Sequence, residues 1–126
     1  MKIYIAGRTS QREEVKRLNK IFKSKGFEVL DWTDHLSTKP FDANRRIATK
    51  YAIEDLDFIS DCDVFILLTS DVPGLGSTSE FGMALMSNKT NKKPIIYVVG
   101  SQINNMFYYH PEVRVRKTIE EVLSEI

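Results

Sequence analysis

The chain has 126 residues, 42% of them hydrophobic and 28% charged, and a net charge of +1. This length fits one domain with a single core, and the composition excludes a disordered chain, a collagen-like repeat and a disulfide-rich miniprotein. The near-neutral charge gives no argument for nucleic acid or an acidic membrane as a partner, and no apolar run approaches the roughly 20 residues of a membrane helix. The lone Cys62 cannot form an internal disulfide, so we expect a cytoplasmic protein.

Hydrophobic patterns predict alternating strands and helices along the chain. Short apolar, β-rich runs predict strands at residues 2–6, 27–30, 63–68, 94–99 and 113–115. Apolar residues at helical spacing predict helices at residues 11–25, 45–60, 78–87 and 117–126. Polar stretches with Pro or Gly predict loops at residues 31–44 and 71–77, and the pattern at residues 103–109 is ambiguous.

This alternation implies a parallel sheet with helices on both faces. We therefore predict an α/β fold of the flavodoxin-like or Rossmann-like type, with three layers and five parallel strands in the order 2-1-3-4-5. A single domain is expected to span residues 1–126. In the first helix, Val15, Leu18 and Phe22 recur at helical spacing and are expected to face the core.

Two sequence patterns predict where helices begin. Ser10 followed by Glu13, and Ser77 followed by Glu80, both fit the capping box, in which Ser and Glu satisfy free backbone N–H groups of the first turn. Gly26 is expected to end the first helix.

The candidate site follows from the predicted strand order. In such sheets ligands bind at the carboxyl ends of the strands where the order reverses, here between the first and third strands. The loops at residues 7–10 and 69–77 should meet there. In the second loop, Gly74 and Gly76 allow a ligand close to the backbone, and the following helix N-terminus offers free N–H groups.

This glycine-containing loop does not match the common nucleotide motifs. No Gly-Lys-Ser/Thr follows it, so it is not a Walker A loop. The dinucleotide fingerprint belongs after the first strand, where only Gly7 is present. We therefore disfavour NAD, FAD and P-loop ATP chemistry and expect no cofactor.

Glu80 is the residue of most interest, and its pattern has two interpretations. As a capping-box residue it would only accept a backbone N–H. As a nucleophile it must be ionised, and a nearby helix N-terminus favours the carboxylate form. Spacing alone leaves both interpretations open.

Asp55 differs from its acidic neighbours in the second predicted helix. The polar residues that recur every three to four positions form one stripe: Lys50, Glu54, Asp57 and Asp61. Asp55 falls outside it, between Tyr51 and Ile59, which are expected to face the core. A carboxylate on that side needs a partner or a role, either a local hydrogen bond or catalysis. Tyr4, in the first strand, is a packing residue or a third member of the site.

Metal and thiol chemistry have little support in the sequence, and no metal is expected. His35 and His110 lie in unrelated segments without metal-ligand spacing, and Cys62 has no CxxC partner. Met83 and Met86 are expected to fill the core. A receiver domain would need an Asp at the end of the third strand, and a flavin carrier a longer Ser/Thr-rich loop after the first.

Taken together, these residues resemble the nucleoside 2-deoxyribosyltransferase superfamily, which includes 2′-deoxynucleoside 5′-monophosphate N-glycosidases. The most specific segment is 76–84, GSTSEFGMA, which is similar to the family's G-T-x-x-E-x-G-x-A motif. Weaker similarities cover most of the remaining chain, at residues 2–7, 55–56, 63–66, 93–96 and 104–106.

The resemblance implies cleavage or transfer at the N-glycosidic bond of a 2′-deoxynucleoside or its 5′-monophosphate. Glu80 would form a covalent glycosyl intermediate, as in retaining glycosidases. Tyr4 and Asp55 would orient Glu80 and assist the leaving base. Asn104 and Met106 would reach the sugar of a partner copy, which implies a homo-oligomer.

Two positions depart from the family's pattern. Six residues before the nucleophile the family has Asp or Ser, whereas this chain has Gly74, so Asp71 or Ser77 would have to substitute. In the first loop the hydrolases have a small polar residue and then a basic one, whereas here Arg8 precedes Ser10. Arg8 is still expected to contact a phosphate, which slightly favours the monophosphate.

Substrate contacts are expected from both loops and from the first turn of the third helix. These residues are Gly7, Arg8, Ser10, Gly74, Gly76, Ser77 and Thr78. The partner would be a small nucleoside or nucleotide. The alternative function is a non-catalytic module that binds a nucleotide or nucleotide sugar on the same scaffold.

Overall fold

The computed structural model describes residues 1–126 and contains a sheet of five parallel strands. They are β1 (Lys2–Ala6), β2 (Glu28–Val29), β3 (Val64–Leu68), β4 (Ile95–Val99) and β5 (Val113–Arg116), in the order β2-β1-β3-β4-β5. This confirms the predicted flavodoxin-like α/β fold and its strand order. The order reverses between β1 and β3, whose carboxyl ends therefore flank the expected crevice.

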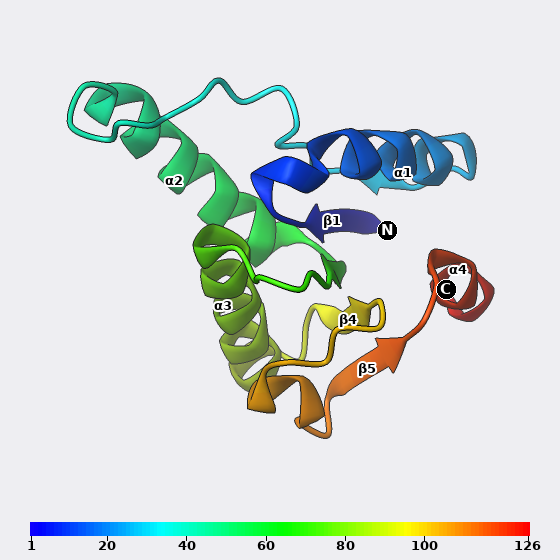
Figure 1. The fold of residues 1–126 in the computed structure, drawn as a ribbon. Coiled ribbons are helices and arrows are strands. Elements are labelled where there is room, and N and C mark those ends of the chain that lie inside the picture. Colours follow the sequence, from blue (N-terminus) through cyan, green and yellow to red (C-terminus); the bar gives the residue numbers. More distant parts are fainter.

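Helices cover both faces of the sheet (Figure 1). Helices α1 (Arg12–Ser24) and α4 (Ile119–Glu125) lie on one side, and α2 (Arg45–Asp61) and α3 (Leu75–Asn91) lie on the other. Two short 3-10 helices, η1 (Thr9–Gln11) and η2 (Met106–Tyr109), stand in the connections. Helix η2 lies in the segment at residues 103–109, whose sequence pattern was ambiguous. None of the helices combines the length and apolarity needed to cross a bilayer.

The core forms along the three central strands, whose side chains are covered on both faces. Residues of β1, β3 and β4 supply most of the buried apolar cluster, as is typical of parallel strands between two helix layers. Val15, Leu18 and Phe22 of α1 are buried against one face, as their spacing predicts. The other face carries Tyr4, whose ring stacks on Phe65 of the neighbouring strand with 5.8 Å between centroids.

The predicted starts of α1 and α3 are both wrong, because in neither helix is the expected serine the N-cap. Helix α1 begins at Arg12 because η1 precedes it, and the Gln11 side chain, not Ser10, accepts a backbone N–H at this turn, that of Arg8, at 2.8 Å. Helix α3 begins at Leu75 with Gly74 as its N-cap, so Ser77 already lies in its first turn. The predicted end of the first helix is confirmed, since Gly26 follows α1 with a φ of +91°.

Met83 and Met86 do not fill the core. They are 43% and 59% exposed, and they line a groove between α2 and α3 together with Leu56. Helix α3 buries Phe81 and Ala84 instead. Adjacent positions of a helix differ by 100° in direction, and apolar residues lie on several sides of α3, so residue type alone does not identify its inward face.

Candidate active site

The two loops predicted to meet do so at the N-terminus of α3. A Cβ atom added to Gly74 would lie 2.9 Å from Arg8 Cγ and 2.9 Å from Ser77 Oγ. The backbone of Gly74 is extended (φ −72°, ψ 141°), which any residue can adopt, so this position requires glycine for space rather than for conformation. Arg8 and Ser77 therefore occupy the volume that a side chain at position 74 would need.

The two residues expected to substitute at position 74 lie in different surroundings. Ser77 is 6% exposed, and its hydroxyl donates to the Gly74 carbonyl oxygen at 3.2 Å. Asp71 is exposed, and its carboxylate accepts the N–H of Val72 at 2.9 Å. Ser77, not Asp71, thus lies beside the glycine, and the Arg8 stem covers the other side.

Glu80 projects from the second turn of α3 toward β1 and accepts a hydrogen bond from the Tyr4 hydroxyl. The capping interpretation is wrong because α3 begins five residues earlier, at Leu75, with Gly74 as N-cap. Burial raises the pKa of Glu80 to about 7; the Tyr4 hydrogen bond acts to lower that pKa, and the nearby Asp55 charge acts to raise it. Glu80 is therefore a carboxyl group that changes charge near neutral pH.

Tyr4 is fixed by its packing. Its side chain is fully buried, with the ring against Phe65 and, at 6.1 Å between centroids, Phe58 of α2. Burial, the Glu80 charge and the Asp55 charge raise the pKa of its hydroxyl far above the ordinary value. Tyr4 consequently remains a hydrogen-bond donor to Glu80 at any physiological pH.

Asp55 faces inward from α2, as the helical spacing predicts. Its side chain is 27% exposed, but its Oδ1 atom is buried and has no hydrogen-bond partner. Burial raises the pKa of Asp55 to about 6, His35 acts to lower that pKa, and Glu54 acts to raise it. The charge of Asp55 in turn raises the pKa values of both Tyr4 and Glu80, which shows that the three groups share one electrostatic environment.

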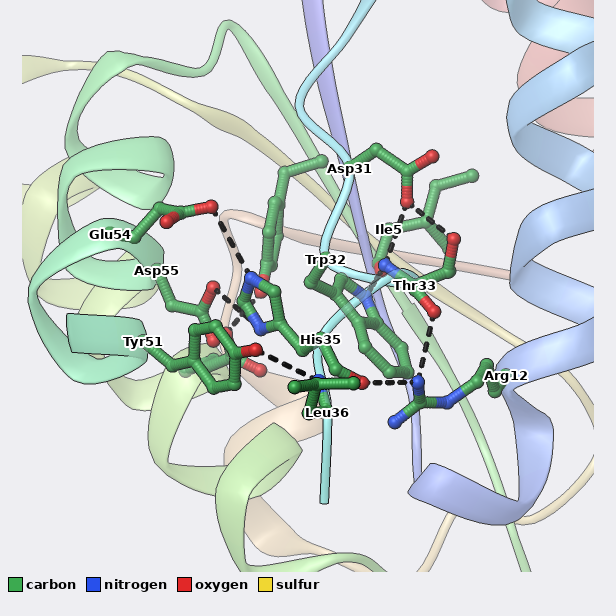
Figure 2. A network of polar contacts seen from close by, with 12 residues as sticks. Ile5, Arg12, Asp31, Trp32, Thr33, His35, Leu36, Tyr51, Glu54 and Asp55 are labelled. Carbon is green, nitrogen blue, oxygen red and sulfur yellow. Dashed lines mark hydrogen bonds and ion pairs between the residues drawn. The ribbon is translucent and has the colours of Figure 1, made fainter. Parts of the chain in front are cut away.

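His35, which the sequence gave no reason to select, completes the surroundings of Asp55 (Figure 2). The loop after β2 brings it against α2, where its Nδ1 lies 3.9 Å from Asp55 Oδ1 and its Nε2 lies 3.3 Å from Glu54 Oε1. Periodicity cannot place a residue in a loop, and His35 is separated from α2 by a long polar segment. The only available signal was an imidazole close to the buried Trp32 in an otherwise polar stretch.

The other predicted substrate residues lie in the two loops and in the first turn of α3. Ser10 is exposed in η1, Thr78 is half-buried in the first turn of α3, and Gly76 is exposed with open space where a Cβ would stand. Gly7 lies under the Gln11 side chain, whose amide donates to the Thr69 carbonyl at 2.9 Å and so joins the loops after β1 and β3.

Asn104 and Met106 lie after β4. The Asn104 amide donates to the carbonyl oxygens of Ser70 and Asp71, at 3.0 and 3.4 Å, so within this chain it supports the β3–α3 loop. Met106 is 76% exposed at the start of η2. The homo-oligomer in which these residues would reach a second copy stays a prediction.

The chemical capacity of the site comes from two carboxyl groups with raised pKa values. One, Glu80, is held by a buried tyrosine hydroxyl; the other, Asp55, has one buried oxygen and a histidine beside it. The charge of Asp55 disfavours ionisation of Glu80, so the protonation states of the two groups are linked. Such a pair provides a nucleophile or base together with an acid at neutral pH.

Comparison with known proteins agrees with this fold. No protein-family model and no curated protein matches the sequence. Among solved structures, the chain is similar to a CMP N-glycosidase from Clostridium botulinum, BcmB, with a TM-score of 0.62 and 19% sequence identity. The alignment covers 99% of this chain and 97% of that one, so the two share their fold over almost their whole lengths.

Proposed function

We propose that this protein is an enzyme that cleaves the N-glycosidic bond of a nucleoside 5′-monophosphate, with Glu80 as the nucleophile. The observation that carries the proposal is the buried Tyr4 hydroxyl bound to the Glu80 carboxylate at the switch point of the sheet. Support also comes from the fold shared with a CMP N-glycosidase. In a variant of the same reaction, a second base instead of water accepts the glycosyl group.

In the first step, a Glu80 carboxylate oxygen attacks the anomeric carbon C1′ as the C1′–N bond breaks. The bonding electron pair leaves with the base, and a proton from Asp55 neutralises it. The transition state is oxocarbenium-like, and the product is a glycosyl ester on Glu80. The Tyr4 hydrogen bond orients the attacking carboxylate toward the same point in each turnover.

In the second step, water attacks C1′ and breaks the ester bond. The Asp55 carboxylate takes the proton from this water, which restores both side chains and releases the sugar phosphate. When a second nucleobase replaces the water, the same step completes a transfer. Water and base therefore compete for one intermediate, and exclusion of water from the site would favour transfer.

The 5′-phosphate is assigned to Arg8 and to the N-terminus of α3. Arg8 is half-buried, and its stem is packed against Gly74, the N-cap of that helix. Its guanidinium is therefore carried on a side chain whose first atoms are already fixed, beside backbone N–H groups that attract anions. Arginine also suits a phosphate because it offers two parallel N–H donors.

The Arg8→Gln substitution tests this assignment. We expect kcat/KM for the 5′-monophosphate to fall about tenfold to a hundredfold, since a hydrogen bond to a charged group contributes about 1.5–3 kcal/mol. The free nucleoside should change less than about threefold. Arg17→Gln, at an exposed position of α1, serves as the matched control. Equal losses on both substrates would contradict a phosphate role for Arg8.

The function itself is tested with a panel of substrates, read by release of free base. The panel pairs ribo- and 2′-deoxyribonucleosides with their 5′-monophosphates, each with and without an acceptor base. We expect release from at least one monophosphate, and faster release than from its nucleoside. Binding of nucleotides in calorimetry with no release from any member would favour the non-catalytic binding module instead.

A further inference from the structure

His35 is held more firmly than its place in a long loop suggests. Its ring stacks on that of Tyr51, with 3.8 Å between centroids and 1° between planes. The next residue, Leu36, donates its backbone N–H to the Tyr51 hydroxyl at 2.9 Å. The imidazole is therefore fixed in position and in orientation on the surface of α2 (Figure 2).

Arg12 holds the same segment from the opposite side. One guanidinium nitrogen donates to the carbonyl oxygens of Thr33 and His35, at 2.9 and 2.5 Å. The guanidinium also lies 5.7 Å from the centre of the Trp32 ring, whose indole N–H donates to the Ile5 carbonyl of β1 at 2.7 Å. Six separate contacts thus join this stretch of loop to α1, β1 and α2.

The fixed ring faces an oxygen that lacks a partner. Asp55 Oδ1 is buried and accepts no hydrogen bond, and His35 Nδ1 lies 3.9 Å away from it. A buried carboxylate oxygen without a donor costs free energy, so its persistence beside an immobilised histidine calls for a role. The other ring nitrogen faces Glu54, whose side chain is 36% exposed to solvent.

We infer that His35 is a positioning residue for Asp55, an inference that rests on the proposed glycosidic reaction. The Nδ1 side of the His35 ring faces Asp55 Oδ1. The transferable proton of Asp55 therefore resides on Oδ2. Protonated Oδ2 then points away from the loop and donates to the leaving base. After the proton has left, the carboxylate faces an imidazole rather than only apolar surroundings. His35 does not touch the substrate in this role.

The charges around Asp55 set the sign of the effect. Glu54, on the same helix, acts to raise the pKa of Asp55. The charge of Asp55 in turn raises the pKa values of Tyr4 on β1 and Glu80 on α3, and Tyr51 of α2 stacks on the other side of the environment, against the His35 ring. His35 is the one group that favours the carboxylate form. Removing its imidazole should therefore make Asp55 harder to ionise.

Carboxyl-carbon NMR measures this without any turnover. We expect the titration of Asp55 to move upward by at least half a pH unit in His35→Phe, where the aromatic ring preserves the stacking on Tyr51. His110→Phe, at the only other histidine, should leave it unchanged. An Asp55 titration identical in wild type and His35→Phe would overturn the inference, whether or not the protein proves to be a glycosidase.

Kinetics then separate positioning from a merely structural role. We expect His35→Phe to lower kcat about a hundredfold with KM little changed, since misplacing a reacting group costs about that much. The basic limb of its pH profile should move to higher pH. His35→Asn, whose amide nitrogen replaces Nδ1, should recover most of the rate, whereas His35→Gln, which replaces Nε2, should not. Equal rates for the Asn and Gln variants would overturn the assignment to Nδ1.

Discussion

Replacing Glu80 by Gln is expected to lower base release by about four orders of magnitude or more, as removal of a nucleophile does in other covalent enzymes. An amide oxygen is a poor nucleophile and cannot form the glycosyl ester. The Tyr4 hydroxyl can still donate to the amide oxygen, so the local structure should be retained. The measurement is single-turnover release of base at enzyme concentrations above that of the substrate.

The control for this variant is Glu13→Gln, at an exposed position of α1. Both proteins should give the wild-type circular dichroism spectrum, and both should bind nucleotide. Because Glu80 does not cap α3, loss of a helix cap cannot explain a loss of activity. Wild-type turnover by a folded Glu80→Gln protein would eliminate the covalent mechanism and leave the binding module as the better description.

The Asp55→Asn substitution is expected to lower kcat by about a hundredfold to ten-thousandfold, the usual contribution of a general acid. The productive form of the enzyme has Glu80 ionised and Asp55 protonated, and it is the less populated of the two singly protonated forms because Glu80 has the higher pKa. With pKa values of about 7 and about 6 for the two groups, the wild-type pH profile of kcat/KM should be bell-shaped with its maximum between these values.

The variant should change this profile in a defined way. The basic limb, which reports loss of the Asp55 proton, should disappear. The acid limb should then report Glu80 alone and should not move to lower pH, because in the wild type Asp55, the group with the lower pKa, contributes most to that limb. A nucleotide of N7-methylguanine, whose base leaves without needing a proton, should lose much less rate. Asp57→Asn, exposed on the same helix, is the matched control, and an unaltered profile in Asp55→Asn would contradict the acid role.

The architecture was predictable because its signals are local and repeated. Central strands covered on both faces appear as continuous apolar runs, such as Val64–Leu68, and the right-handed connections leave few possible strand orders. The start of α3 was not predictable, because Ser77 and Glu80 fit a capping box as well as they fit the interior of a helix. The extended backbone of Gly74 shows that the helix begins at Leu75.

The site was partly predictable for the same reason. Asp55 was distinguished by regular helical geometry, and Glu80 by its place after the β3 loop. His35 and Arg12 were not found, since their arrangement depends on the path of a loop that has no period. The close packing of Arg8 on Gly74 also escaped prediction, because a contact between two loops leaves no pattern in either of them.

The burial of Glu80 also makes the site a source of instability in the fold. In an unfolded chain this carboxyl group ionises near 4.5, and in the folded protein its pKa is about 7. A raised folded-state pKa means that the folded form binds the proton more tightly, so its contribution to stability is complete below about pH 4.5 and is lost as the pH rises through 7. The difference is on the order of 3 kcal/mol, a substantial part of the 5–15 kcal/mol that typically holds a domain together. At neutral pH the ionised Glu80 therefore lowers the free energy of unfolding and with it the melting temperature. A bound nucleotide that shields this charge should raise the melting temperature by more than its contacts alone would.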